Sequence, residues 1–250
     1  RGVEAAGELL AIRGRVIPST LSNVTLVGST VSGETLIGES RVGNSSDRLR
    51  SLTLIPTNPA AHPEAVRAIE DADMVVIGPG SLFTSIVPNL LISGISAALA
   101  DSPAFKVYVC NVAEEPAQTE GYSVLDHLNI VRHYGGNDVV EAVVANRFMP
   151  EGPTPAGLDF IRARKPWDDD VLLVEANVID ETDKSTTARH DPVKLSNAIT
   201  EAYRKYRGRR RRLPRIRINL DSKRPSNGRD SINGVGNGYP RSSRDKGAQK

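Results

Sequence analysis

The sequence predicts an α/β protein with a doubly wound, mostly parallel sheet and a small antiparallel excursion. Three observations predict this fold class. Apolar runs of a few residues alternate with longer segments of helical periodicity, which is typical of a parallel sheet covered by helices on both faces. Short alternating segments near the start favour hairpin strands. The 250 residues are also enough for one such domain with a sizeable core.

The first expected elements are a helix and the small antiparallel sheet. Residues 3–12 have the spacing of the last turns of an amphipathic helix. Residues 23–28 and 34–38 predict two short strands joined by a turn, and residues 52–55 predict a third. Because a doubly wound domain normally opens with a strand and a glycine-rich turn, we expect this chain to lack the beginning of its domain.

The following segment alternates helices and strands. Pro63 predicts the start of a helix that ends near residue 71, since proline fits the first helical turn. Residues 74–77 form an apolar run too short for a helix, which predicts a strand buried on both faces. The remaining expected elements are a helix over 88–100, a strand over 106–110, a helix over 122–134, strands over 139–145 and 171–174, and a closing helix over 192–204.

The loop after residues 74–77 is the first candidate binding segment, because ligands of parallel sheets bind beyond the carboxyl ends of the strands. Its glycines let the backbone approach a ligand, and its hydroxyl and amide groups suit a phosphate. The alternative is an ordinary strand-to-helix turn in which serine or threonine caps the helix. The pattern matches neither Walker A nor G-x-G-x-x-G. The candidate residues are Gly78, Pro79, Gly80, Ser81, Thr84, Ser85 and Asn89.

The second candidate loop follows the strand at 106–110. Asn111 lies at the strand end and offers an amide donor and an acceptor. Thr119, Gly121 and Tyr122 supply a hydroxyl, a flexible position and an aromatic ring, a set suited to a base or a sugar. The alternative is that Thr119 and Glu120 cap the next helix.

Asn146 and Arg147 begin the third candidate loop. Arg147 has two interpretations, a contact to a diphosphate or a solvated side chain. Before the closing helix, Asp191 is expected to be the N-cap, which leaves Arg189 able to reach an anion.

No catalytic residue, cofactor or metal site is predicted. The single cysteine, Cys110, excludes an internal disulfide framework and a cysteine-rich metal site. The four histidines have no metal-ligand spacing, and the aspartates at 168–170 favour a solvated turn. No apolar stretch is long enough to span a bilayer and no signal-peptide pattern is present, so the expected location is the cytoplasm, without membrane insertion.

The chain divides by composition into a body, residues 1–206, and a basic tail, residues 207–250. The tail contains an arginine cluster at 207–212, and Gly, Ser, Asn and Pro crowd its later part. This composition predicts disorder with weak, non-specific polyanion contact. Nucleic-acid binding through the arginines is the weaker alternative, since no aromatic residues alternate with them.

Several segments resemble the gluconeogenesis-factor (YvcK-like) family, which is related to 2-phospho-L-lactate transferase (CofD). The resemblance spans roughly residues 3–203 and is most specific over residues 72–91. It rests on Arg13-Gly14-Arg15-Val16-Ile17-Pro18-Ser19-Thr20, Gly38-Glu39-Ser40, the stretch from Ala72 through Gly78-Pro79-Gly80-Ser81 to Leu91, Tyr108-Val109-Cys110-Asn111, Thr119-Glu120-Gly121-Tyr122 and Arg189-His190-Asp191-Pro192.

The resemblance implies a Rossmann-like, three-layer fold and a regulatory protein that binds UDP-N-acetylglucosamine and affects cell-wall synthesis, cell shape and carbon metabolism. It implies no established catalysis, and a homo-oligomer is left open. The alternative is a CofD-like transferase that moves a phospholactyl-type group from a nucleotide diphosphate, with Glu114, Glu115 and Glu120 as its candidate carboxylates.

The sequence departs from the family pattern at several places. The amino-terminal Gly-Gly-Gly-Thr-Gly loop of the family and a second helix start that carries Gly-Asn are missing, and the basic tail has no counterpart in the family. Residues 112–115 are more acidic than the resemblance leads us to expect. The usual Thr-Asp-Gly-Tyr has Glu120 at its second position, and the usual Asn-Asn appears as Asn146-Arg147.

Overall fold

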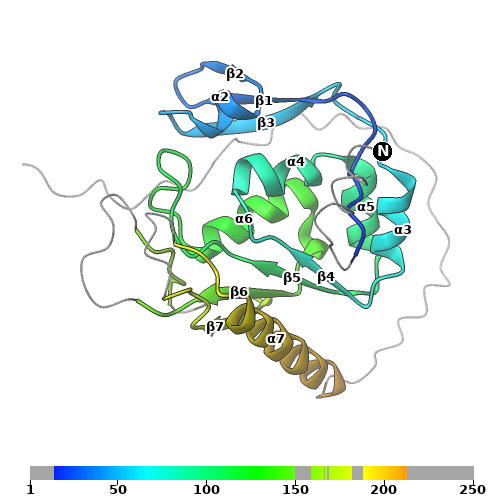
Figure 1. Ribbon diagram of the computed structural model, residues 1–250, viewed down its shortest axis with the longest axis vertical. Coiled ribbons are helices and arrows are strands. Elements are labelled where there is room, and N and C mark those ends of the chain that lie inside the picture. The colour runs from blue at the N-terminus through cyan, green and yellow to red at the C-terminus, as the bar shows by residue number, and fades with distance from the viewer. Residues whose placement is uncertain (1–13, 150–158, 166, 168, 182–187, 213–250) are drawn as a thin grey trace, which may run out of the picture.

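The computed structural model describes residues 14–149, 159–165, 167, 169–181 and 188–212 (Figure 1). The helix expected over residues 3–12 lies outside the described residues, as does most of the basic tail.

A four-stranded parallel sheet forms the centre of the protein. Its strands lie in the order β4-β5-β6-β7, and each pairs in parallel with its neighbour. Every residue of β5 and β6 is buried, as expected for strands covered on both faces. The predicted mostly parallel α/β fold is confirmed. The strands are β4 (Met74–Ile77), β5 (Phe105–Val109), β6 (Ala142–Asn146) and β7 (Leu172–Ala176).

Strand β4 differs from its prediction. Its side chains were expected to be buried on both faces, but Val76 is 42% exposed. Within the described residues β4 pairs only with β5 and is therefore an edge strand. An apolar run alone does not distinguish an edge strand from a central one.

Helices cover both faces of the sheet (Figure 1). The helices α4 (Val87–Leu90), α5 (Ser93–Asp101) and α6 (Val124–Gly135) lie on one face, and α7 (Pro192–Arg212) lies on the other. A short 3-10 turn, η2 (Asn137–Val139), leads from α6 to β6.

Helix α7 packs on the sheet through small residues. Ala198 and Ala202, one turn apart, are buried in a cluster with side chains from β5, β6 and β7. Asp191 caps the helix as predicted: its Oδ1 accepts the backbone N–H groups of Val193 and Lys194 at 2.9 and 2.8 Å. The helix continues to Arg212, beyond the predicted end at residue 204.

The predicted antiparallel excursion is a separate three-stranded sheet in the order β2-β1-β3. In Figure 1 it lies beyond α4 and α6, on the side away from the parallel sheet. The Tyr134 hydroxyl on α6 accepts the Leu52 N–H of β3 at 2.9 Å, which ties the two layers together. The elements are β1 (Thr25–Thr30), β2 (Thr35–Ile37), the unpredicted short helix α2 (Glu39–Gly43), β3 (Leu49–Ile55) and then the predicted helix α3 (Pro63–Glu70).

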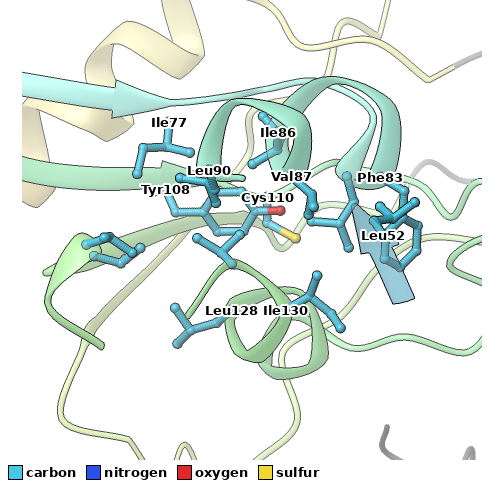
Figure 2. Close-up of a cluster of buried hydrophobic side chains, with 14 of the residues drawn as sticks. Leu52, Ile77, Phe83, Ile86, Val87, Leu90, Tyr108, Cys110, Leu128 and Ile130 are labelled. Atoms are coloured by element: carbon cyan, nitrogen blue, oxygen red, sulfur yellow. The ribbon is translucent and has the colours of Figure 1, made fainter. Parts of the chain in front are cut away.

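The helix predicted over residues 88–100 is wrong in its bounds. A π-helical turn, η1 (Leu82–Ile86), leads directly into α4, and a break at residues 91–92 separates α4 from α5. The side chains of Leu82, Phe83 and Ile86 are buried in the main core, so burial favours a helical start well before Pro88. Figure 2 shows Ile86, Val87 and Leu90 of this segment around Tyr108 of β5 and Cys110, which follows that strand.

No single helix in the described part of the chain is both long and apolar enough to cross a bilayer. The segments Leu82–Leu90 and Ser93–Asp101 reach that length and composition only together, and they are bent by 76° at their break.

Helix α6 begins with a capping box. The Ser123 hydroxyl and backbone N–H both donate to the Asp126 carboxylate at 2.7 Å, and Ser123 accepts the Asp126 N–H in return. The alternative that Thr119 and Glu120 cap this helix is therefore wrong.

The buried His127 on α6 should make the stability of the folded protein sensitive to acid. Burial lowers its pKa to about 4, although a hydrogen bond to the Ser123 backbone opposes the shift. The unfolded chain takes up a proton near the ordinary pKa of about 6.5, where the folded protein does not. The free energy of unfolding should therefore fall by about 3 kcal/mol between about pH 6.5 and about pH 4, and the His127 contribution should stay constant below that.

Urea unfolding across this pH range checks the His127 prediction. The variant His127→Gln lacks the titrating group, so its stability should depend less on acid. An identical pH dependence in the two proteins would contradict the prediction.

Candidate functional site

Three loops meet beyond the carboxyl ends of the parallel strands and line an open pocket of about 470 Å³. This volume lies in the range of small-molecule sites, and the position is the one that open α/β sheets use for ligands. The pocket is lined by Pro79, Gly80 and Ser81 after β4, by Asn111, Val112, Ala113, Glu114 and Glu115 after β5, and by Ala188, Arg189 and His190 before α7.

The first loop brings its backbone close to β5. Gly78 has a φ of +83°, and a Cβ placed on it would lie 3.0 Å from the Val109 carbonyl oxygen. The Gly80 N–H donates to Asn111 Oδ1 at 3.3 Å. Ser81 occupies the N-cap position of η1, but its side chain makes no capping hydrogen bond in the described structure. Its hydroxyl instead donates to Glu115 Oε2 at 2.8 Å.

The second loop places a carboxylate at the centre of this wall. Asn111 Nδ2 donates to Glu115 Oε1 at 2.9 Å, so the two oxygens of Glu115 accept hydrogen bonds from two different loops. From the sequence, Glu115 was predicted only as a candidate carboxylate of the alternative transferase. The acidic stretch at 112–115 was the available signal for it.

Thr119, Gly121 and Tyr122 do not line this pocket. Thr119 is 1% exposed, and its Oγ1 accepts the Glu115 N–H at 2.8 Å, so it supports the loop from behind. Gly121 has a φ of +75° in the turn. The buried Tyr122 ring packs edge-to-face on Phe83, with 6.4 Å between ring centroids.

Thr84, Ser85 and Asn89 also lie outside the pocket lining. They belong to the helical segment that replaces the expected loop. Asn89 accepts a hydrogen bond from the Ser19 hydroxyl and donates to the Ser85 carbonyl at 2.7 Å. Their role as ligand contacts stays a prediction.

Asn146 is 2% exposed and is not part of the pocket lining. Its side chain hydrogen-bonds backbone groups instead. Its Nδ2 donates to the Phe148 carbonyl at 2.7 Å. Its Oδ1 accepts the N–H groups of Phe148 and Val178 at 3.2 and 3.3 Å. Asn146 thus joins the segment after β6 to the segment after β7.

The third wall of the pocket is Ala188, Arg189 and His190, which lie directly before α7. Arg189 was predicted to contact an anionic ligand from its position before the helix, whereas His190 was not predicted to contact a ligand. Burial lowers the pKa of His190, against a hydrogen bond with the Cys110 backbone, so the imidazole is neutral near pH 7. Its Nε2 is buried and has no hydrogen-bond partner among the described residues.

The charges around the pocket are mixed. Glu114 and Glu115 contribute carboxylates, and Arg189 contributes a guanidinium. Burial raises the pKa of the Cys110 thiol, so this residue beneath the site is not a thiolate nucleophile at neutral pH. Within the described ranges, no group of three metal-ligating side chains is present.

The fold and the pocket together define a Rossmann-like α/β protein with a ligand-sized site at the carboxyl edge of its parallel sheet. The sequence profile of the 2-phospho-L-lactate transferase CofD family matches residues 1–183. The chain belongs to this family.

Relatives support the predicted resemblance. A Bacillus subtilis protein named gluconeogenesis factor is 30% identical over 205 residues, which cover 80% of this chain and 64% of that protein. A relative from Nostoc sp. (strain PCC 7120) is 37% identical over 216 residues, or 81% of this chain. The match covers 46% of the Nostoc protein, so this chain spans about half of its length.

Two crystal structures of a Bacillus halodurans protein share the fold. One is similar with a TM-score of 0.73 and 30% sequence identity over 80% of this chain and 66% of that chain. The other, described as a member of the UPF0052 family, has a TM-score of 0.71. The predicted Rossmann-like fold and the resemblance to gluconeogenesis factors are confirmed.

Proposed function

We propose that this chain is the nucleotide-sugar-binding part of a regulatory protein of the gluconeogenesis-factor type. The proposed ligand is UDP-N-acetylglucosamine, and the proposed role is to adjust cell-wall synthesis, cell shape and carbon metabolism. The observation that carries this proposal is the pocket of about 470 Å³ at the carboxyl edge of the parallel sheet.

The pocket lining suits the parts of such a ligand. Gly80 has no side chain to keep a ligand from the backbone, and Arg189 offers a cation for a diphosphate.

Calorimetric titration of the full chain with UDP-N-acetylglucosamine tests the proposal. We expect a saturable heat of binding. Absence of heat from protein that is folded by circular dichroism would contradict the proposed function.

Arg189→Gln should weaken UDP-N-acetylglucosamine binding about 10- to 100-fold, because it removes a charge-assisted hydrogen bond to the diphosphate. Arg67→Gln on the exposed surface of α3 is the matched control, since it removes the same charge away from the pocket. Calorimetry of both variants checks the prediction. Equal affinities of the two variants would remove Arg189 from the site.

A transferase of the CofD type is the second candidate. Glu114 and Glu115 in the pocket lining and the description of the matched family favour it. Turnover of a nucleotide-activated phospholactate with a flavin-like acceptor would support it. Absence of turnover together with tight UDP-N-acetylglucosamine binding would favour the regulatory role.

A further inference from the structure

We propose that Glu115 makes its wall of the pocket a receptor for ligand hydroxyl groups and keeps phosphate groups away from that wall. This inference rests on the proposed function, because the hydroxyls would come from the sugar or the ribose of a nucleotide sugar. The inference places the phosphates of the ligand on the side of the pocket that Arg189 lines.

The Glu115 carboxylate already occupies the donors that a phosphate would need. Ser81 Oγ donates to one carboxylate oxygen at 2.8 Å, and Asn111 Nδ2 donates to the other at 2.9 Å. A carboxylate oxygen has room for more than one hydrogen bond, so each oxygen can still accept from a ligand. The wall therefore presents acceptors rather than free donors.

The carboxylate is held in place from behind. The Glu115 backbone N–H donates to Thr119 Oγ1 at 2.8 Å, and its carbonyl accepts the N–H groups of Gln118 and Thr119 at 3.1 and 2.9 Å. Gln118 is itself fixed by a 2.8 Å bond to the Gly43 carbonyl. The backbone at Glu115 is thus fixed within the loop. A phosphate would therefore not easily push the Glu115 side chain away from Ser81 and Asn111.

The charge of Glu115 determines what can bind beside it. A phosphate at Ser81 and Asn111 would lie next to an anion of like charge, which is unfavourable. A hydroxyl that donates to a carboxylate forms a charge-assisted hydrogen bond. In dinucleotide-binding domains, acidic side chains accept hydrogen bonds from ribose hydroxyls in this way.

His190 also lines the pocket. Its imidazole makes a hydrogen bond with the Cys110 backbone, and Nε2 has no partner in the described part of the chain. A neutral imidazole bonded at one nitrogen leaves the other to accept a hydrogen bond. Because Nε2 is buried, the acceptors that this wall presents to a ligand are the two oxygens of Glu115.

The variant Glu115→Gln in the full chain tests the inference, because it keeps the side-chain shape and removes the charge. Calorimetry uses three probes: UDP-N-acetylglucosamine, UDP and inorganic diphosphate. We expect the affinity for UDP-N-acetylglucosamine to fall at least about tenfold and the affinity for diphosphate to rise at least about tenfold. Glu120→Gln is the control, since it neutralises an exposed carboxylate of the same loop that lies outside the pocket lining and accepts the Ala117 N–H.

The UDP titration distinguishes the two sources of hydroxyls. An unchanged UDP affinity assigns the Glu115 contact to the sugar, and a parallel loss for UDP assigns it to the ribose. The inference is overturned if diphosphate affinity does not rise, including the case in which neither protein binds it, or if UDP-N-acetylglucosamine binds Glu115→Gln equally or more tightly.

The diphosphate comparison separates this inference from the proposed function. If the unaltered chain binds no UDP-N-acetylglucosamine, the proposed function fails, while the diphosphate result still decides the role of Glu115. If Glu115→Gln does not fold, Ser81→Ala replaces it, because it removes the donor that orients one oxygen of the Glu115 carboxylate. That variant should bind UDP-N-acetylglucosamine about fivefold more weakly, and an unchanged affinity would overturn the inference.

Discussion

Replacement of Phe83 by alanine is expected to lower the free energy of unfolding by about 3–5 kcal/mol. Phe83 is 1% exposed and follows the pocket loop in the first turn of η1. Its ring packs edge-to-face on Tyr122, and Figure 2 shows it beside Leu52 of the small antiparallel sheet. The substitution therefore removes one large side chain that joins the pocket loop, the second loop and the outer sheet.

Urea unfolding of Phe83→Ala at neutral pH measures the effect. Phe83→Leu is the matched control, since it keeps most of the buried volume, and it should cost about 1–1.5 kcal/mol. A loss below about 1 kcal/mol for the alanine variant would show that the site collapses around the missing ring. In that case Phe83 would not hold the three segments together.

Two strands of the parallel sheet could be predicted closely because their signal is local, whereas the strand predicted over 139–145 begins only at Ala142, after the turn η2. The strand predicted over 106–110 is Phe105–Val109, and the one predicted over 74–77 has those bounds. The helical segment after Ser81 could not be predicted in the same way. Leu82 and Phe83 are buried in a core cluster that also contains Tyr122 and side chains of the small antiparallel sheet, and such contacts between distant segments leave no periodic pattern in the local sequence.

The candidate site was predictable in position but not in its internal hydrogen bonds. Ligands of parallel sheets bind beyond the carboxyl ends of the strands, which predicted the loops that contain Gly80, Ser81 and Asn111. These three residues line one pocket. Asn146 has the same side chain as Asn111 and also ends a strand, but its amide is used by backbone groups of Phe148 and Val178. Only the three-dimensional structure distinguishes an asparagine that lines a pocket from one that holds two segments together.

Replacement of Gly78 by alanine should lower the free energy of unfolding by about 3 kcal/mol, for two separable reasons. A positive φ is unfavourable for alanine by about 1–2 kcal/mol. The new Cβ would also lie 3.0 Å from the Val109 carbonyl oxygen, a backbone atom of β5 that cannot move without disturbing the sheet. The added cost of this close approach is comparable to overpacking in a core, about 1–3 kcal/mol.

Gly33→Ala separates the two costs. Gly33 has a φ of +96° in the turn between β1 and β2, and nothing lies within 4 Å of its would-be Cβ. It should therefore show the conformational cost alone, and urea unfolding of both variants gives the close-approach cost by difference. Equal losses would mean that the pocket loop can move away from β5 without cost, whereas a larger loss at Gly78 would show that contact with the sheet fixes the backbone of the pocket wall.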